Sequence, residues 1–233
     1  MSLLTLKALG GGYSEVDIIH GIDLDVRAGE IVTIAGTNGA GKSTLVKALL
    51  GLLPRVHGDV ILDGQSITAL QAEDRFYAGL AYVPQVANVF QSLTVRENLL
   101  VVRGVKNITS RIDEVLQAFP ALIEKLSQRA GNLSGGERQQ LAFARALMPA
   151  PRLMILDEPT AALAPALVEK VFSLVADLPA RGVAVLMVEQ RARQALEISQ
   201  RGYILDQGRC VLSGEASALL SDSRMTQLYL GTH

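Results

Sequence analysis

The sequence predicts an α/β fold with a mostly parallel sheet, an antiparallel β edge and an inserted helical subdomain, in one domain over residues 1–233. Three observations carry this prediction. Short apolar runs alternate with helical patterns beyond residue 150, as is typical of a parallel sheet. Alternating apolar positions near the N-terminus indicate antiparallel strands. Between them, residues of about 94–150 have helical periodicity and no β-rich run, which predicts the insertion.

The first half of the chain is expected to hold the antiparallel edge and the first buried strand. Strands are predicted at 3–8 and 16–26, separated by the glycine-rich Gly10–Gly12, and at 31–35, 59–62 and 80–83. Asp63-Gly64 predicts a tight turn, and Pro84 ends the last of these strands. Helical spacing covers 43–50 and 72–77.

The inserted subdomain and the second half follow in order. One apolar helical face is expected from Ile112, Val115, Leu116 and Phe119. Further helices are predicted at 134–148, 165–178 and 191–198, and strands at 152–156 and 183–188. Two final strands, 202–205 and 209–212, flank a turn at Gln207-Gly208 and precede a short helical tail.

Composition limits the classes of function. The 22 basic and 23 acidic residues give a net charge of −1, so no positive field favours nucleic acid, and we expect no such partner. The single cysteine, Cys210, can form no internal disulfide, which agrees with a reducing compartment. The N-terminus lacks a secretory pattern, and Leu45–Leu53 falls short of the roughly 20 apolar residues of a membrane span. Any membrane role is therefore expected through a partner.

The segment from Gly36 to Thr44 reads GTNGAGKST, a complete phosphate-binding loop between a predicted strand and a predicted helix. Glycine lets backbone N–H groups approach a β-phosphate, Lys42 supplies a charge to the β/γ oxygens, and the Ser43 hydroxyl suits Mg²⁺. A chance glycine-rich turn is the alternative, which these flanks disfavour. We therefore expect a P-loop NTPase core that binds a nucleotide through Gly36, Asn38, Gly39, Ala40, Gly41, Lys42, Ser43 and Thr44.

A second motif, LMILDE, is a buried strand that ends in two carboxylates. The carboxyl edge of an open α/β sheet is where ligands bind. Asp157 is expected to reach Mg²⁺, and Glu158, directed elsewhere by strand alternation, to orient or deprotonate the attacking water. Lys42 is expected to act in catalysis together with Glu158. The alternative is that both acids merely begin a turn before Pro159.

A third motif, LSGGE, opens a helical segment. Ser134 and Glu137 form a capping box, which alone would explain both residues. A cap does not require Gly135 and Gly136, each of which weakens a first turn by roughly 1 kcal/mol relative to alanine. Exposed N–H groups, the serine hydroxyl and the positive helix end indicate a second phosphate-binding surface.

The set GTNGAGKST, YVPQ, LSGGERQQLAFARAL and LMILDEPT, in this order over nearly the whole chain, resembles the nucleotide-binding subunits of ATP-binding-cassette transporters. The resemblance implies a head-to-tail dimer in which each ATP lies between one subunit's phosphate loop and the other's LSGGE segment. It also implies that Tyr13 stacks on adenine, and that Gln85 contacts Mg²⁺ and water and reports to membrane subunits. An ordinary strand-end aromatic is the alternative for Tyr13.

Two positions depart from that family's general pattern. Gln190 stands where most members have a histidine that touches the γ-phosphate, and Ala164 where most have an aspartate. Gln190 can donate a hydrogen bond but cannot become a cation. A slow, degenerate site is one interpretation. However, VEQ, the LAP loop and Tyr229-Leu230-Gly231 are similar to the shorter ATPase of branched-chain amino acid importers, which implies an active site with Glu158, Lys42 and Gln190 in catalysis.

The expected function is ATP hydrolysis that drives a branched-chain amino acid importer from the cytoplasmic face of the inner membrane. The expected partners are a second ATPase subunit, identical or paralogous, transmembrane permease subunits and an extracytoplasmic solute-binding protein. Phe90 and Leu93, within residues 86–95, are expected either to dock onto the permease or to pack against their own domain. Urea, amides or another amino acid class remain alternative cargoes, and a non-transport ATP switch on DNA or ribosomes is the other class.

Overall fold

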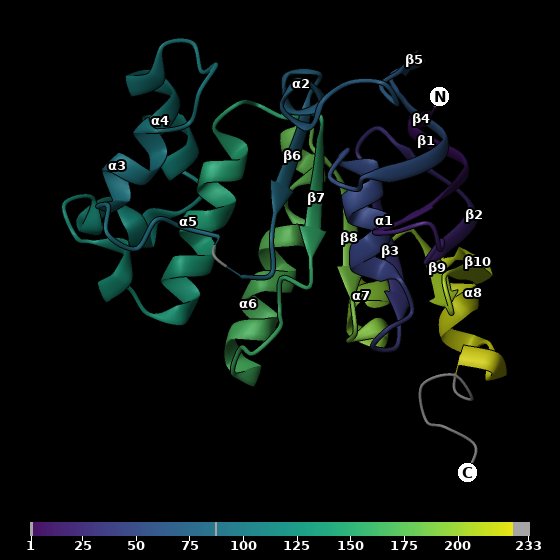
Figure 1. Ribbon diagram of the computed structural model, residues 1–233. Coiled ribbons are helices and arrows are strands. Elements are labelled where there is room, and N and C mark those ends of the chain that lie inside the picture. The colour runs from purple at the N-terminus through teal and green to yellow at the C-terminus, as the bar shows by residue number, and fades with distance from the viewer. Residues whose placement is uncertain (1, 87, 226–233) are drawn as a thin grey trace.

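The computed structural model describes residues 2–86 and 88–225 (Figure 1). The strands are β1 Ser2–Gly12, β2 Ile19–Arg27, β3 Ile31–Gly36, β4 Arg55–Leu62, β5 Gln65–Ser66, β6 Leu80–Val83, β7 Leu153–Asp157, β8 Ala184–Glu189, β9 Arg201–Asp206 and β10 Arg209–Glu215. The helices are α1 Lys42–Leu49, α2 Ala72–Tyr77, α3 Val95–Leu100, α4 Ile108–Leu116, α5 Gly135–Leu147, α6 Pro165–Ala176, α7 Ala192–Glu197 and α8 Ala216–Ser221. Short 3₁₀ helices occur at Pro120–Lys125, Ala130–Asn132 and Pro179–Arg181.

The larger sheet has six strands in the order β10-β9-β3-β8-β7-β6. The pairs β3-β8, β3-β9, β7-β8 and β6-β7 are parallel, and only β9-β10 is antiparallel in this sheet as described. Every residue of β3, β7 and β8 is buried, because both faces of the sheet are covered. The mostly parallel sheet predicted from the alternating pattern is confirmed.

The molecule is built in layers around α1 (Figure 1). One core cluster joins α1 to the antiparallel sheet β2-β1-β4-β5 and to one face of the six-stranded sheet, through residues such as Val32 and Ile34. The opposite face packs against α5 and α6 through alternate residues such as Ile31 and Met154. A smaller cluster holds α7 and α8. The parallel strands thus present their carboxyl ends at one edge, beside the N-terminus of α1.

The segment that contains α3, α4 and α5 lies to the left of the sheet in Figure 1. The predicted apolar face is confirmed, because Ile112, Val115, Leu116 and Phe119 are all buried. The prediction of helix throughout 94–130 was wrong in part, since residues 101–107 are turns. Gly104 there has φ +76°, a left-handed conformation that interrupts a helix.

The antiparallel N-terminal edge is confirmed, but the prediction that Gly10–Gly12 separate the first two strands was wrong. These glycines are the last residues of β1, and residues 13–18 connect β1 to β2. A Cβ on Gly11 would lie 2.3 Å from the Arg55 carbonyl oxygen of the neighbouring strand. The glycines therefore allow close backbone approach within the sheet and do not end the strand.

A buried ion-pair network joins β9 to β2 and to the residue that precedes β3. Arg201, with an 11% exposed side chain, contacts Glu30 at 2.6 Å and Asp25 at 2.9 Å, and Tyr203 donates to Asp25. The hydrogen bond from Arg201 lowers the pKa of Asp25 below its ordinary value. Burial alone would raise the pKa of Glu30, but hydrogen bonds from Arg201 and from the Arg27 N–H lower it on balance.

Replacing Arg201 with methionine should lower the free energy of unfolding by about 3 kcal/mol near neutral pH, because Glu30 would remain buried without its cation. Since the folded-state pKa values of both acids are lowered, their contribution is present above the ordinary values and lost as the pH falls through the lowered ones. The wild type should therefore lose more stability than R201M between about pH 6 and pH 3. Urea unfolding across this range measures both effects.

The matched control is R224M, which removes an exposed arginine from its pair with Asp222. This variant should unfold at the same urea concentration as the wild type near neutral pH. Equal losses in R201M and R224M would contradict the role given to the buried network.

Candidate functional site

The loop between β3 and α1 has the backbone of a phosphate-binding turn. Gly39 and Gly41 have φ values of +82° and +97°, which residues with a Cβ rarely adopt, and Gly41 caps α1. Lys42 begins the helix and is 5% exposed. Its Nζ donates to the carbonyl oxygens of Gly36 at 2.8 Å and Thr37 at 3.0 Å. The ammonium group is thus held within the curve of the loop.

Glu158 lies at the centre of the polar groups around this loop. Its Oε1 is 3.5 Å from Lys42 Nζ, and its Oε2 accepts hydrogen bonds from the side-chain amides of Gln85 and Gln190, both at 3.0 Å. β7 ends one residue earlier, and Glu158 has φ +47°. The left-handed backbone therefore sets the direction of this side chain, and the prediction that strand alternation does so was wrong.

Asp157, the last residue of β7, lies beside Ser43. The Ser43 hydroxyl is 3.5 Å from Asp157 Oδ1, and the Tyr82 hydroxyl donates to Oδ2 at 3.2 Å. Burial raises the pKa of Asp157 despite these hydrogen bonds, and burial together with the Asp157 charge raises the pKa of Tyr82. A desolvated carboxylate of this kind gains from a nearby cation.

The donors beside the phosphate loop fit Mg²⁺. Within residues 2–86 and 88–225, no group of three His, Cys, Asp or Glu side chains is placed to hold a metal ion. A hydroxyl, a carboxylate and an amide oxygen are available from Ser43, Asp157 and Gln85. Mg²⁺ characteristically binds through one or two carboxylates together with phosphate oxygens and water.

Gln190 links the loop to Glu158. Its Nε2 lies 2.6 Å from Asn38 Oδ1 and 3.1 Å from Glu158 Oε1. The preceding residue, Glu189, is buried and accepts hydrogen bonds from the Thr160 N–H at 3.0 Å and the Thr160 hydroxyl at 2.7 Å. The carboxyl end of β8 thus fixes the chain that follows Glu158.

These side chains open into a cavity of about 480 Å³ at the carboxyl ends of the parallel strands. Its lining contains Ile18 and nine residues that the sequence predicts for the site: Asn38, Gly39, Gly41, Lys42, Ser43, Thr44, Gln85, Glu158 and Gln190. Of the remaining predicted residues, Gly36 and Ala40 are buried parts of the loop's backbone, and Asp157 adjoins Ser43.

The predicted residues of LSGGE lie elsewhere, at the N-terminus of α5, and do not line this cavity. The capping box is present, since Ser134 Oγ accepts from the Glu137 N–H at 3.3 Å and Glu137 Oε2 accepts from the Ser134 N–H at 2.9 Å. A Cβ on Gly136 would lie 2.7 Å from Leu167 of α6. A Cβ on Gly135 would meet no atom within 4 Å. Packing within the described chain therefore accounts for Gly136 but not for Gly135.

Three further positions complete the account of the predicted site. Tyr13 directly follows β1, and its side chain is 49% exposed. Ala164 is exposed and precedes α6 without a side-chain cap. Tyr229-Leu230-Gly231 lies outside the described residues.

Tyr82 and Glu189 are polar members of the site that sequence reasoning missed. A signal for Tyr82 was present, because strand neighbours two residues apart share a face. Tyr82 pairs with Ile155, two residues before Asp157. The sequence indicates only that Glu189 ends a buried strand. Its contact with Thr160 depends on how the loop between β7 and α6 folds, which no local pattern reveals.

Comparisons with known proteins agree with this geometry. The family model described as ABC transporter matches residues 19–161. The branched-chain amino acid transport ATP-binding protein BraG of Pseudomonas aeruginosa is 38% identical, over 98% of this chain and 100% of its own length. The probable branched-chain amino acid transport ATP-binding protein LivF of Archaeoglobus fulgidus is 41% identical, over 98% of each chain. The lipopolysaccharide export ATP-binding protein LptB of Escherichia coli K12 is 34% identical, covering 99% of this chain and 98% of its own.

A solved structure has the same fold along its whole length. The ADP conformation of MJ1267, an ATP-binding cassette of an ABC transporter, superposes with a TM-score of 0.88 at 27% identity and covers 100% of both chains. Among residues 2–86 and 88–225, no helix has the length and apolar character needed to cross a membrane. With the nucleotide loop, the paired carboxylates and whole-length relatives all in agreement, the chain belongs to the ABC transporter family, as an ATP-hydrolysing subunit of a transporter.

Proposed function

We propose that this chain binds Mg²⁺–ATP in the cavity beside α1 and that its hydrolysis drives an importer of branched-chain amino acids. The chemistry rests on one observation, the convergence of Lys42, Gln85 and Gln190 on the carboxylate of Glu158. The cargo rests on the names of two relatives that match the chain from end to end, BraG and LivF. In this proposal the whole chain is one cassette domain, with residues of about 94–150 as its helical subdomain.

In the proposed mechanism, the loop N–H groups and Lys42 bind the β- and γ-phosphates. Ser43, Asp157 and Gln85 would hold Mg²⁺, which when bound neutralises phosphate charge. Glu158 orients a water molecule and accepts its proton while the water oxygen bonds to the γ-phosphorus and the bond to the β,γ-bridging oxygen breaks. The products are ADP and inorganic phosphate. Gln190, already bonded to Glu158, keeps that carboxylate aimed at the γ-phosphate position.

The proposed working state is a head-to-tail dimer in which the N-terminus of α5 of one subunit completes the ATP site of the other. Gly135 supports this arrangement, because its open side suits close approach of a phosphate to the helix end. A related cassette, MJ0796, has been solved as a dimer bound to ADP and Pi, with 26% identity and a TM-score of 0.78. The second subunit of the transporter is an identical or a paralogous ATPase, and Tyr13 is the base-stacking residue of each site.

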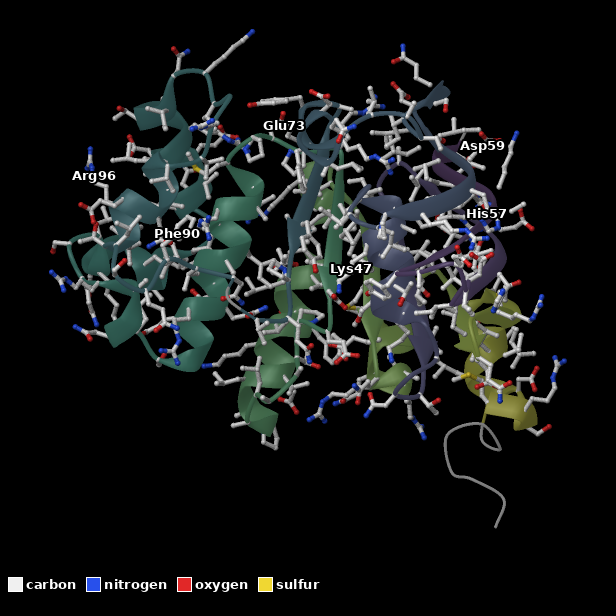
Figure 2. The ribbon with its side chains drawn as sticks, in the orientation of Figure 1. Lys47, His57, Asp59, Glu73, Phe90 and Arg96 are labelled. Atoms are coloured by element: carbon white, nitrogen blue, oxygen red, sulfur yellow. The ribbon has the colours of Figure 1, made fainter. Side chains whose placement is uncertain are left out.

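A second cavity, of about 470 Å³, lies between the six-stranded sheet and the helical segment and suits the transmembrane partner. Phe90 is 50% exposed at this groove, and Asn98 holds its loop by hydrogen bonds to the backbone N–H and C=O of Phe90. Figure 2 shows Phe90 on the helical side and Glu73 near α2. The guanidinium of Arg145 lies 4.5 Å from the Phe90 ring centroid. The Nε of Arg145 is buried and has no hydrogen-bond partner in the described residues.

We propose that a cytoplasmic segment of a permease subunit occupies this groove. An apolar side chain of that segment would pack on Phe90, and an acidic group would pair with Arg145. In this proposal the chain works at the cytoplasmic face of the inner membrane, and an extracytoplasmic solute-binding protein serves the permease from its far side. The alternative, that Phe90 is fully packed against its own domain, is disfavoured by its exposure.

A second candidate cargo is favoured by one observation. LptB, named for lipopolysaccharide export, matches 99% of this chain at 34% identity. The higher identities of BraG and LivF favour amino acids over lipopolysaccharide, and urea or amides remain a further alternative cargo.

The native cell distinguishes these cargoes. The E158Q variant should abolish uptake of labelled leucine and leave uptake of labelled urea and the lipopolysaccharide content of the outer surface unchanged. E169Q, which alters an exposed glutamate of α6, is the matched control and should transport normally. F90E should also lose leucine uptake, although the purified chain should still hydrolyse ATP. Leucine uptake that survives in E158Q, or a loss confined to urea or lipopolysaccharide, would refute the proposed cargo.

A further inference from the structure

The half-exposed Tyr13 is tied to α1, the helix that begins at the phosphate loop. Lys47, on the second turn of α1, donates a hydrogen bond from Nζ to the Tyr13 hydroxyl at 3.0 Å. The same Nζ is 5.1 Å from the centroid of the Tyr13 ring. Figure 2 shows Lys47 reaching from the middle of the molecule, beside α1. The cation therefore holds the outer end of the ring and leaves much of the ring surface free.

The loop that carries Tyr13 is also fixed at its other end. Asp17 lies 3.5 Å from the Arg55 guanidinium and 3.6 Å from His57 Nε2, both on β4. Arg55 also donates a hydrogen bond to the carbonyl oxygen of Glu15. With its backbone fixed in this way, the Tyr13 side chain retains only its own torsions, and the bond to Lys47 restricts these.

We propose that Lys47 is a positioning residue for ATP: it fixes the Tyr13 ring as a preformed platform for the purine base, without itself contacting the base. This inference rests on the proposed stacking of adenine on Tyr13. An exposed tyrosine that must be ordered by the ligand loses side-chain freedom at the moment of binding. A ring that Lys47 has already ordered avoids that loss, so the benefit falls on nucleotide affinity and not on the chemical step.

Helix α1 therefore positions the groups that bind both the base and the phosphates. Lys42 and Lys47 are both residues of α1, one at the loop and one beneath the ring. The spacing between the phosphate site and the base platform is then set by the helix together with the connection between β1 and β2 that β4 holds.

The test is a double-mutant cycle on the full chain, read by calorimetric titration with ADP and with pyrophosphate, which has no base. K47M removes the donor, and Y13F removes the acceptor while keeping the aromatic face. Each should weaken ADP binding about fivefold, and the double variant should also be about fivefold weaker, because both changes break one bond. Pyrophosphate affinity should be unchanged. K47R should restore ADP binding, and KM for ATP should rise in K47M while kcat stays the same.

K106M, which changes an exposed lysine distant from the site, is the matched control and should bind ADP as the wild type does. Multiplied losses in the double variant would overturn the proposal, because Lys47 would then act independently of the Tyr13 hydroxyl. So would a loss of pyrophosphate affinity in K47M. Y13A distinguishes the stacking role of Tyr13 from the positioning role of Lys47. Unchanged ADP binding in Y13A refutes the stacking role. Weakened ADP binding in Y13A with normal ADP binding in K47M refutes only the role of Lys47.

Discussion

Replacing Glu158 with glutamine should slow ATP hydrolysis by about a thousandfold while ATP still binds. Glutamine keeps the shape of the side chain, but its amide cannot accept a proton from the attacking water. The phosphate loop and the Tyr13 platform are untouched by the change. Lys42 loses its ion pair with Glu158 but keeps its hydrogen bonds to the carbonyl oxygens of Gly36 and Thr37. Release of inorganic phosphate by the purified chain measures the rate, and titration with ATP measures the affinity.

Glu158 has two amide neighbours, so the variant should also fold normally. Gln85 and Gln190 can each donate to the amide oxygen of the new glutamine, which replaces the carboxylate they contact now. E169Q should hydrolyse ATP at the wild-type rate. Phosphate release by E158Q within about fivefold of the wild type would mean that another group takes the proton, and the role given to Glu158 would be wrong.

Replacing Gly135 with aspartate should reduce the rate of ATP hydrolysis by about a hundredfold or more without lowering the melting temperature. The new side chain has open space around it, since a Cβ there would meet no atom within 4 Å. A carboxylate in the first turn of α5 interacts favourably with the helix dipole, so the fold should be unchanged or slightly more stable. The same charge would repel an ATP phosphate brought to this helix end by a second subunit.

The divergence of stability and activity is the informative part of that result. T109D places the same charge in the first turn of α4, at an exposed position of the same helical segment, and should leave hydrolysis unchanged. If G135D hydrolyses ATP normally, the N-terminus of α5 does not approach a nucleotide. If G135D melts at a lower temperature, Gly135 serves the fold instead.

The sequence predicted the frame of this site because its main elements are local. The strand 80–83 and the helix 72–77 coincide with β6 and α2, and the buried strands before the loop and before Asp157 were each placed within one residue. Hydrophobic periodicity and a motif with flanking elements are sufficient for such features.

The features that the sequence did not reveal depend on distant contacts. Gly10–Gly12 resemble a break between strands locally, but close approach to β4 makes them part of β1. The left-handed conformation of Glu158 is uncommon for any residue with a side chain, and no local pattern indicated it. The Lys47–Tyr13 bond joins residues that are 34 positions apart and required the packing of α1 against β1.

The central claim is that the α5 terminus of one subunit completes the ATP site of the other, and mixing two inactive variants of this chain tests it most directly. K42M disables the phosphate loop and G135D disables the α5 terminus, so each alone should be inactive. In a head-to-tail pair of the two, the intact loop of the G135D chain faces the intact α5 terminus of the K42M chain. An equal mixture should then hydrolyse ATP at about a quarter of the wild-type rate, since half of the dimers are mixed and each has one complete site. A mixture no more active than the separate variants would contradict the account.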